Sequence, residues 1–437
     1  MNVISREQYV DVLNDRIQRD IIDICTRCGK CAEACPMIGP AEIPLTDAPS
    51  LVGGVLAILA GEPGTADSRR WVEVCSSSGS CVSACGDGVD PLFMMEMARV
   101  ALKREHDAKT LQHNATRAFQ RMAKSVRYLS RLFLDPQTLE RLDPRASRVA
   151  RLEPPEKIFY TGCNVLRTPH IALICLDILD RLNVTYEVMG GPSHCCGAYQ
   201  MREGDTSAAT GMAMNTIGKM VKAAAPEVIS WCPSCQLQFR SVHLPTHAAA
   251  HEQKSSFDFT PFFMFMERRM ADLGTILTRP VHRRVALDER PFDPAVIEAV
   301  KRVLLSIPGI EIVELDVPHI GMMSNTIPMP DFKKRLREQK FAAASAAGVT
   351  TFATIYHACH REVVSYSASV EFEIVNVMEL IAESAGISFH DSFKEFQSVG
   401  DVDKYIQSQM HMVESHRISM EDLRTVALSE FAAHRPN

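Results

Sequence analysis

Four cysteines near the N-terminus have the spacing of an iron–sulfur cluster loop. They follow the pattern C-x2-C-x2-C-x3-C-P and are Cys25, Cys28, Cys31 and Cys35, closed by Pro36. This spacing turns the chain tightly enough for the thiolates to converge on a cubane [4Fe–4S] cluster, and the fourth cysteine of such a run usually serves a neighbouring cluster. The pattern therefore predicts a redox protein that conducts electrons, with a second cysteine run nearby. A zinc knuckle and unligated thiols are the alternatives.

The second run lies downstream and lacks one cysteine. Cys75, Cys81 and Cys85 keep the positions of the first run, whereas Ser78 replaces the second cysteine and Gly86 replaces the proline. We therefore expect the second cluster to be a [3Fe–4S] cluster. One alternative is a [4Fe–4S] cluster with Ser78 as a ligand, and the other is that no second cluster is present. Trp71, just before this run, is given no role. Crossed ligation assigns the first cluster to Cys25, Cys28, Cys31 and Cys85, and the second to Cys35, Cys75 and Cys81 with Ser78.

A third array places five cysteines on three segments of the chain. They are Cys163, the pair Cys195 and Cys196, and the pair Cys232 and Cys235. A disulfide between adjacent cysteines is strained, so the array indicates a larger or unusual metal centre. A zinc site that uses four of the five thiols is the alternative.

Three further residues lie near this array. His194 and Tyr199 flank the adjacent cysteines. Each is either a proton donor to a departing thiolate or a hydrogen-bond partner of the ligands. Cys175 falls on the apolar face of a helix and is predicted to be a small core residue.

The third array resembles the cysteine-rich CCG domain of the B-type subunits of heterodisulfide reductase, and the runs before it resemble the ferredoxin-like C-type subunits. Their fusion resembles the catalytic subunit of the membrane-type reductase, its relatives in sulfur metabolism, and the iron–sulfur subunits of glycolate and glycerol-3-phosphate dehydrogenases. The resemblance covers nearly the whole chain. It implies a noncubane [4Fe–4S] cluster that binds and cleaves a disulfide. We expect Cys195 and Cys196 to be catalytic, together with His194 because it adjoins them in the sequence. The ligands that the resemblance implies are Cys163, Cys195, Cys196, Cys232 and Cys235.

A weak internal repeat follows the third array. One constant shift in numbering carries 194–197 onto 318–321 and 232–235 onto 356–359. Thr168 and Asp293 each precede a proline and are predicted as matching helix N-caps. Each half is expected to alternate strands and helices. The first comprises 157–160, 168–182, 184–188, 207–225 and 227–231, and the second comprises 284–287, 294–305, 310–315, 331–347 and 351–356.

The second half has lost four of its five cysteines. Cys359 survives, Asp288 stands near the first ligand position, and Ile320 cannot bind iron. We therefore expect no noncubane cluster there. His319, His357, Cys359 and His360 form either a zinc site or a polar remnant packed against the first half.

Composition limits the class of protein. The chain has 437 residues, 46% of them hydrophobic, and a net charge of −6. This favours a soluble acidic protein and argues against nucleic-acid binding. No N-terminal stretch has a signal-peptide pattern, and Ser5 with Gln8 instead predicts a capping box. The apolar run 51–60 is too short to span a membrane, so we expect a cytoplasmic protein whose cysteines bind metal.

Two basic stretches are expected to be helical. The longer, 94–134, is predicted as one helical stretch that either docks a partner or an anionic membrane surface or is simply solvated. The shorter forms a basic face that is expected to be solvated and consists of Lys333, Lys334, Arg335, Arg337 and Lys340.

These patterns together predict an α+β multi-domain protein in which an α-helical ferredoxin domain precedes a duplicated α/β CCG module. The expected divisions are 1–135 for the ferredoxin-like domain, 136–155 for a linker, 156–275 and 280–390 for the two CCG repeats, and 391–437 for a helical tail.

The expected function is that of an oxidoreductase subunit that passes electrons between cubane clusters and a noncubane cluster handling a disulfide or persulfide-type sulfur. The alternative is a pure electron-transfer subunit of a flavin-dependent hydroxy-acid dehydrogenase. The resemblance implies as partners a flavoprotein, further B- and C-type subunits, and a sulfur-carrier or lipoyl-bearing protein.

Overall fold

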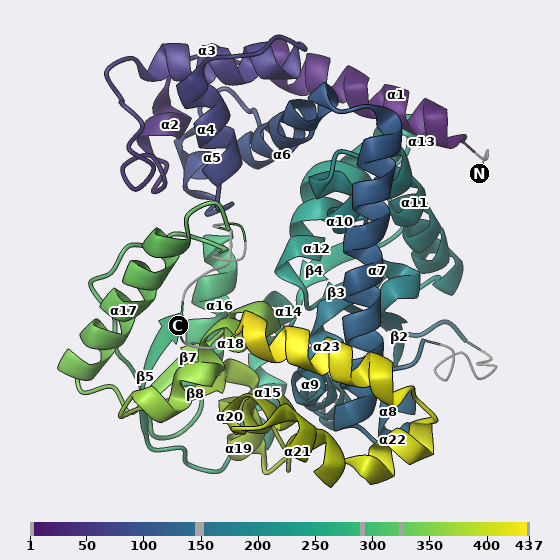
Figure 1. Ribbon diagram of the computed structural model, residues 1–437, viewed down its shortest axis with the longest axis vertical. Coiled ribbons are helices and arrows are strands. Elements are labelled where there is room, and N and C mark those ends of the chain that lie inside the picture. Colours follow the sequence, from purple (N-terminus) through teal and green to yellow (C-terminus); the bar gives the residue numbers. More distant parts are fainter. Residues whose placement is uncertain (1–3, 145–152, 289–292, 323–324, 326, 435–437) are drawn as a thin grey trace.

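The structure is a computed structural model that describes residues 4–144, 153–288, 293–322, 325 and 327–434. It is an α+β protein in which many helices surround two small parallel sheets. The N-terminal helices lie at one end of the molecule, the first sheet lies beneath them on the right of Figure 1, and the second lies at the lower left. The C-terminal helices run along the lower edge.

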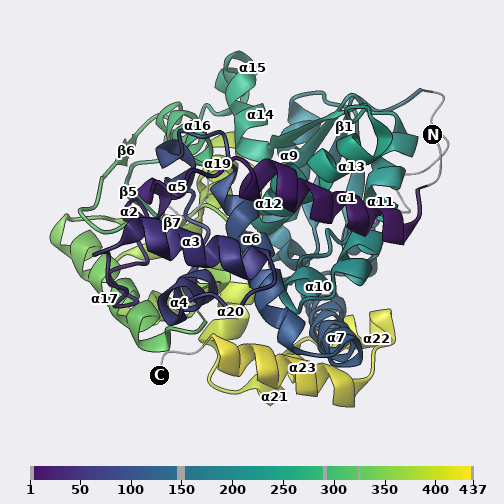
Figure 2. The same cartoon turned by 90° about the horizontal axis from the view of Figure 1, so that it is seen from above.

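The first helix, α1 (Arg6–Ile17), begins with the predicted capping box: the Ser5 side chain accepts from the Gln8 backbone, and the Gln8 side chain accepts from Ser5. Figure 2 shows α1 lying over α11 and α13 of the first α/β module. The Tyr9 hydroxyl donates to the His243 carbonyl at 2.5 Å, and Arg16 donates to the Thr246 hydroxyl at 2.8 Å. The N-terminal helix is therefore anchored to a segment that lies far along the chain.

The first two cysteine runs lie among short helices. These are η1 (Gln18–Ile22), α2 (Lys30–Glu33), α3 (Ala48–Leu59), α4 (Ala66–Val74), α5 (Ser80–Ala84) and α6 (Pro91–Leu102). Their apolar faces share one core that includes Trp71, Phe93 and Met94. The cysteine loops lie between these helices, so the core holds the two loops against each other.

The basic stretch 94–134 is interrupted, contrary to the prediction of one helical stretch. A 3-10 turn, η2 (Lys103–Glu105), ends α6, and Asp107 caps the new helix α7 (Ala108–Phe133). The Asp107 carboxylate accepts from the backbone N–H groups of Lys109 and Thr110, and this cap fixes the start of α7. The expected linker contains a short helix, α8 (Pro136–Glu140), and its residues 145–152 lie outside the described chain.

The first sheet has the strand order β2-β1-β3-β4, with all neighbours parallel. The predicted first three strands are present, and a fourth, unpredicted strand lies at the edge. Thr168 is the N-cap residue of α9 and Pro169 follows it, as predicted, but the Thr168 hydroxyl donates to the Val165 carbonyl and does not accept from the helix backbone. The elements of this module are β1 (Lys157–Gly162), η4 (Asn164–Arg167), α9 (Pro169–Arg181), β2 (Tyr186–Gly190), η5 (Pro192–His194), α10 (Ala198–Arg202), α11 (Thr206–Ala223), β3 (Glu227–Ser230), α12 (Pro233–Leu237), η6 (Gln238–His243), α13 (Leu244–His251), β4 (Asp258–Pro261), α14 (Phe262–Arg268) and α15 (Met270–Ile276).

The second sheet has the matching order β6-β5-β7-β8 and is also parallel. Asp293 caps its first helix as predicted, because its carboxylate accepts from the Ala295 backbone. The elements are β5 (Arg283–Asp288), α16 (Pro294–Leu305), β6 (Ile310–Ile312), α17 (Pro330–Ala346), β7 (Thr351–Thr354), α18 (His357–Val363), η8 (Val364–Ser369), β8 (Glu373–Asn376) and α19 (Val377–Ala385).

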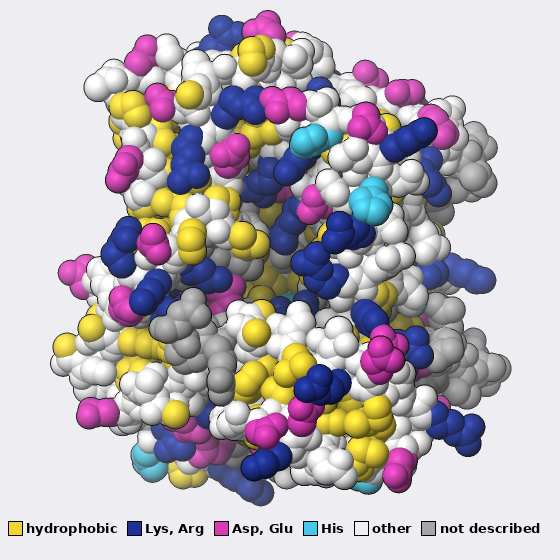
Figure 3. Space-filling view, viewed as in Figure 1, with side chains coloured by type: hydrophobic (Ala, Val, Ile, Leu, Met, Phe, Trp, Pro, Cys, Tyr) yellow, Lys and Arg dark blue, Asp and Glu magenta, His cyan; other side chains and the backbone are white. Residues whose placement is uncertain are grey.

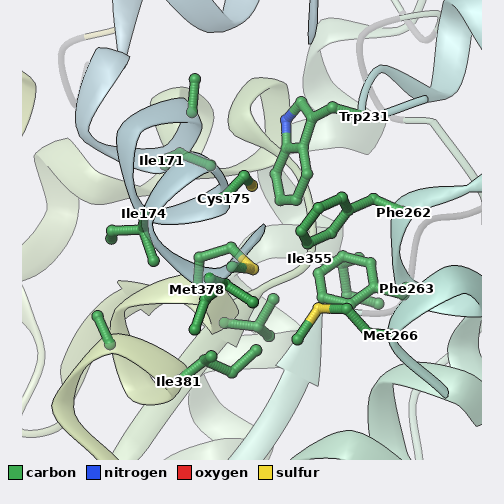
Figure 4. Close-up of a cluster of buried hydrophobic side chains, with 14 of the residues drawn as sticks. Ile171, Ile174, Cys175, Trp231, Phe262, Phe263, Met266, Ile355, Met378 and Ile381 are labelled. Carbon is green, nitrogen blue, oxygen red and sulfur yellow. The ribbon is translucent and has the colours of Figure 1, made fainter. Parts of the chain in front are cut away.

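One large core joins the two sheets. Figure 4 shows Cys175 and Trp231 from the first module facing Ile355 and Met378 from the second. Cys175 is fully buried on α9, which confirms it as a core residue. The two modules therefore share one large apolar core, and each also has a smaller core of its own.

The expected helical tail consists of α20 (Ser392–Ser398), α21 (Val402–Ser408), α22 (Met410–His416) and α23 (Met420–Ala433). Its last helix packs on α7, where Lys124 pairs with Asp422 at 2.6 Å and Ser125 donates to Glu430 at 2.8 Å. Among the helices of the described chain, none has the length and apolar character needed to cross a bilayer.

Candidate metal centres in three cysteine arrays

The two N-terminal cysteine loops have the same backbone conformation. Arg27 and Ser77 have φ angles of 59° and 56°, and Gly29 and Gly79 have φ angles of 84° and 80°. Each glycine starts a short helix, α2 or α5. Left-handed backbone at matching positions turns both loops in the same way, so Ser78 occupies the place that Cys28 has in the first loop.

The first thiol group contains Cys25, Cys28, Cys31 and Cys85. Burial, and then the neighbouring thiols Cys25, Cys28 and Cys85, raise the pKa of Cys31 to about 12. Cys25 likewise has a raised pKa, caused first by burial and also by Asp87, Cys85 and Cys28. Thiols that resist deprotonation on their own become thiolates when they bind a metal ion, so this set fits a soft metal centre.

The second thiol group contains Cys35, Cys75 and Cys81. Burial and the neighbouring Cys75 raise the pKa of Cys35 to about 11. Burial, and then Cys75 and Cys35, raise the pKa of Cys81. The Trp71 indole N–H donates to the Cys35 sulfur at 3.3 Å. Sequence reasoning missed this contact, because tryptophan spacing alone does not show where its nitrogen points.

The loop that carries Ser78 is seated on the second α/β module. The Met322 N–H donates to the Ser76 carbonyl at 2.9 Å, and the Ser76 hydroxyl donates to the Ile320 carbonyl. Between them, Gly321 approaches Ser78 so closely that a Cβ at this glycine would lie 2.5 Å from the Ser78 Cα. Ser78 is 8% exposed. We call this contact the 320–322 seat.

Apolar side chains complete the 320–322 seat. Ile320 joins a buried cluster with Met37 and Val74, and Met322 joins Leu92, with Cys35 and Cys81 packed at the edges of these clusters. The 320–322 seat therefore covers the second thiol group.

The third array converges at the carboxyl end of the first sheet. Cys163 follows β1, Cys195 and Cys196 follow β2, and the last pair lies around the start of α12 after β3. Parallel strands end at one edge, so these loops meet there. All five cysteines are between 2% and 5% exposed.

The five thiols interact directly with one another. Cys163 and Cys196 each share a hydrogen bond with Cys195, which lowers the pKa of Cys195 and raises those of the other two. Cys235 has a raised pKa through its hydrogen bonds to Cys196 and Cys232. A buried set of five converging sulfur atoms fits a thiophilic metal centre.

A glycine permits this convergence. Gly162 has a φ angle of 71°, and a Cβ there would lie 2.7 Å from the Cys232 Cβ and 3.2 Å from the Cys235 sulfur. Neither the backbone nor the neighbouring thiols leave space for a side chain at this position.

His194 and Tyr199 have different partners near the array. The His194 Nδ1 lies 3.1 Å from the Gly190 carbonyl and 2.9 Å from the Ser193 hydroxyl. The Tyr199 hydroxyl accepts from the Asn164 amide at 2.9 Å and lines a cavity of about 100 Å³ beside Cys232. Of the two side chains, Tyr199 is the one that lines this cavity.

The cavity beside Cys232 lies between the two modules and has a basic lining. Arg202 and Arg361 contribute to it, and Glu362 is the one carboxylate among the described residues of its lining. A second cavity of about 410 Å³ also contains Tyr199, together with Arg117 and Arg121 of α7. Lys and Arg side chains gather around a hollow near the centre of the face shown in Figure 3. Anions are attracted to such a surface.

The second module places His357, Cys359 and Asp288 in separate environments. His357 accepts a hydrogen bond from the Trp231 indole at 3.2 Å, and Cys359 lines the small cavity. Asp288 is fully buried and pairs with Lys340 at 2.8 Å. The prediction of a solvated basic face was therefore wrong for Lys340. Its ammonium group is buried because it pairs with the Asp288 carboxylate at the end of β5.

Comparisons with known proteins found one family match and several similar proteins. A family model described as a cysteine-rich domain, CCG, matches residues 158–240. The D subunit of dihydromethanophenazine:CoB–CoM heterodisulfide reductase from Methanosarcina mazei is 21% identical over 401 residues, which cover 84% of this chain and 94% of that protein. The corresponding D subunit from Methanosarcina barkeri is 21% identical over 430 residues, which cover 88% of this chain and 99% of that protein. The chain thus contains a CCG cysteine-rich domain and resembles the D subunits of heterodisulfide reductase along most of its length, as expected of a CCG-type iron–sulfur protein.

Proposed function

We propose that the chain is an iron–sulfur subunit of a heterodisulfide reductase-like complex and acts on a disulfide or persulfide-type sulfur. The observation that supports this most strongly is the convergence of five buried thiols beside a basic cavity, within the segment that matches the CCG family. Two further thiol groups lie among the N-terminal helices, and clusters bound there would pass electrons to this site.

The thiol groups define the proposed ligand sets. Cys25, Cys28, Cys31 and Cys85 would hold a cubane [4Fe–4S] cluster. Cys35, Cys75 and Cys81 would hold a [3Fe–4S] cluster, or a four-iron cluster with Ser78 as its fourth ligand. Cys163, Cys195, Cys196, Cys232 and Cys235 would hold a noncubane [4Fe–4S] cluster. When bound, these groups would carry electrons and take up the substrate sulfur.

The protein's own residues prepare the site for an anionic sulfur compound. Arg202 and Arg361 would attract and orient the negatively charged groups of the substrate. The Tyr199 hydroxyl lies where it would donate a proton to a leaving thiolate, while His194 holds the turn before the adjacent cysteines through its contact with Gly190. Cys195 and Cys196 would carry the chemistry through the cluster that they bind.

The two sheets support an internal duplication as part of this proposal. Their strand orders match, and Gly197 and Gly321 have φ angles of 82° and 84° at corresponding positions. In this interpretation, the second repeat has lost its cluster. It now seats the ferredoxin loop through residues 320–322 and closes the cavity beside Cys232 through His357 and Cys359.

The second candidate is an electron-transfer subunit of a flavin-dependent hydroxy-acid dehydrogenase. The burial of all five CCG cysteines favours it, because a sealed cluster would only relay electrons. The cavity of about 100 Å³ holds part of a sulfur substrate at most without some opening.

The test uses the anaerobically purified full-length protein, reduced with a viologen and offered a disulfide that bears anionic groups. The proposal expects two electrons and two protons to be consumed for each disulfide, with two thiols released. Reoxidation by an artificial acceptor, without thiol release, would instead assign the relay function. A count of about eleven or twelve irons per chain would establish that all three sites are filled.

Ser78→Cys is expected to convert the three-iron cluster into a four-iron cluster. The added thiolate occupies the place of Cys28 in the matching loop and supplies the missing ligand. Iron content should rise by about one per chain, and the EPR signal of the oxidised three-iron cluster should disappear. The control is Ser83→Cys, an exposed position on α5. A four-iron spectrum at this site in the unmodified protein would show that Ser78 already binds iron.

Trp71→Phe is expected to lower the reduction potential of the second cluster. The indole N–H bond to Cys35 favours the more negative, reduced state. If this bond is about 1 kcal/mol stronger in the reduced state, its loss shifts the potential by roughly 40 mV. A redox titration followed by EPR measures the shift. Trp231→Phe is the control, since its indole donates to His357, and an equal shift there would contradict the assignment.

A further inference from the structure

Four metal-binding side chains meet at a buried place outside the cysteine arrays. His170 lies at the start of α9 in the first module, and His360 lies on α18 in the second. Glu379 lies on α19, and Asp391 caps α20. One ligand atom from each residue lies within 4.8 Å of the others. No sequence pattern points to this group, because its members are spread over more than half of the described chain.

His170 has no hydrogen-bond partner although it is almost completely buried. It is 3% exposed, and neither ring nitrogen makes a hydrogen bond. Its Nε2 lies 3.5 Å from Glu379 Oε1 and its Nδ1 lies 3.5 Å from Asp391 Oδ1. Both contacts are longer than a well-formed hydrogen bond, so the two carboxylates leave the buried imidazole incompletely satisfied, and a bound cation would complete the group.

The other histidine faces the same carboxylates. His360 is fully buried, and its Nε2 lies 2.7 Å from Asp391 Oδ2 and 3.9 Å from Glu379 Oε1. In a tetrahedral zinc site, with bonds of about 2.1 Å, neighbouring ligand atoms lie about 3.4 Å apart. The two 3.5 Å contacts of His170 use different ring nitrogens, and only one of these can bind the ion. A set with one ligand atom from each residue lies within 4.8 Å, so the side chains would rotate toward a shared ion to reach the tetrahedral spacing.

Backbone hydrogen bonds hold both carboxylates in place. Asp391 Oδ1 accepts from the N–H groups of Phe393 and Lys394 at 3.1 and 2.9 Å. Glu379 Oε1 accepts from the Asn376 N–H at 2.7 Å as part of a capping box. Ligands fixed by such outer contacts bind metal ions with little reorganisation.

We propose that His170, His360, Glu379 and Asp391 bind a structural zinc ion with two nitrogen and two oxygen ligands. Four protein ligands and nearly complete burial make a closed site, which is typical of structural zinc. The ion would join α9 of the first module to three helices of the second. Because η4 connects Cys163 to α9, the ion would also brace the first loop of the CCG array.

The test measures zinc in the full-length protein after incubation with excess zinc and removal of the unbound ion. We expect about one zinc per chain, with nitrogen and oxygen neighbours near 2.0–2.2 Å in the X-ray absorption spectrum of zinc. This distinguishes the site from zinc in a cysteine array, where sulfur neighbours lie at about 2.3 Å. Absence of bound zinc, or a shell that contains only sulfur, overturns the proposal.

Variants locate the ion. His170→Gln and Glu379→Gln should each reduce zinc occupancy at least tenfold while leaving the iron content unchanged. Glu379→Gln retains an oxygen that can accept from Asn376, so the helix cap is preserved. The control is His390→Gln, which changes an exposed histidine next to Asp391 in sequence. Equal zinc content in all three variants would overturn the assignment, and the spectrum of the unmodified protein decides the matter if a variant does not fold.

Discussion

Cys196→Ala is expected to remove the cluster proposed for the CCG array and to abolish disulfide cleavage. The change deletes one of five converging sulfur atoms and breaks the hydrogen-bonded chain between Cys195 and Cys235. Iron should fall from about eleven or twelve to about seven or eight per chain. The measurement is iron per chain together with thiol release from an anionic disulfide.

Cys175→Ala is the matched control for this variant. Cys175 is also a fully buried cysteine of the first module, but it lies in the shared core of the two sheets. Its replacement should cost about 1–2 kcal/mol of stability through lost packing and should leave the iron content unchanged. An iron count that stays constant in Cys196→Ala would contradict the proposed ligand set. Loss of iron without loss of cleavage would contradict the proposed role of the cluster.

Gly321→Ala is expected to disrupt the 320–322 seat and with it the second ferredoxin cluster. The new Cβ would lie 2.5 Å from the Ser78 Cα and 2.7 Å from the Ser78 backbone nitrogen, and backbone cannot move aside as a flexible side chain can. The residue also has a φ angle of 84°. We expect a loss of about 2–4 kcal/mol of stability from strain and overpacking together, and loss of the EPR signal of the second cluster.

Gly348→Ala separates the two causes. Gly348 has a φ angle of 65°, but no atom lies within 4 Å of a Cβ built there. In this control the alanine has the same left-handed backbone strain, about 1 kcal/mol, but its Cβ contacts no neighbouring atom. If both variants lose equal stability and keep both N-terminal clusters, the close contact between Gly321 and Ser78 does not hold the cluster loop.

The local features of the fold could be predicted because short stretches of sequence determine them. The Ser5 and Gln8 capping box, the Asp293 cap and the buried position of Cys175 all follow from spacing over a few residues. The edge strands β4 and β8 were missed because their pairing depends on neighbours outside each segment, and β4 includes Asp258 and Pro261, which are residue types disfavoured in strands. Lys340 was misassigned because helix periodicity does not show a carboxylate on a neighbouring strand.

The candidate site likewise has a part that local sequence predicts and a part that it does not. Cysteine spacing predicted the candidate ligands, and the structure brings them into three groups. The Trp71 contact with Cys35, the 320–322 seat and the His170 cluster depend on tertiary packing between segments far apart in the chain, so no local pattern could have indicated them. The type of cluster proposed for each thiol group stays a prediction.

The docking of α23 on α7 has a consequence for biosynthesis. Lys124 and Asp422 are separated by 298 positions, so their contact closes a loop that spans most of the chain. Such contacts raise contact order, which slows folding, and closing the loop costs entropy. During translation, the face of α7 that includes Tyr128 and Leu129 stays uncovered until the final helix leaves the ribosome. In the nascent chain, this apolar face of α7 therefore stays exposed and prone to aggregation while about two thirds of the chain is still being made. We expect chaperone binding to concentrate there.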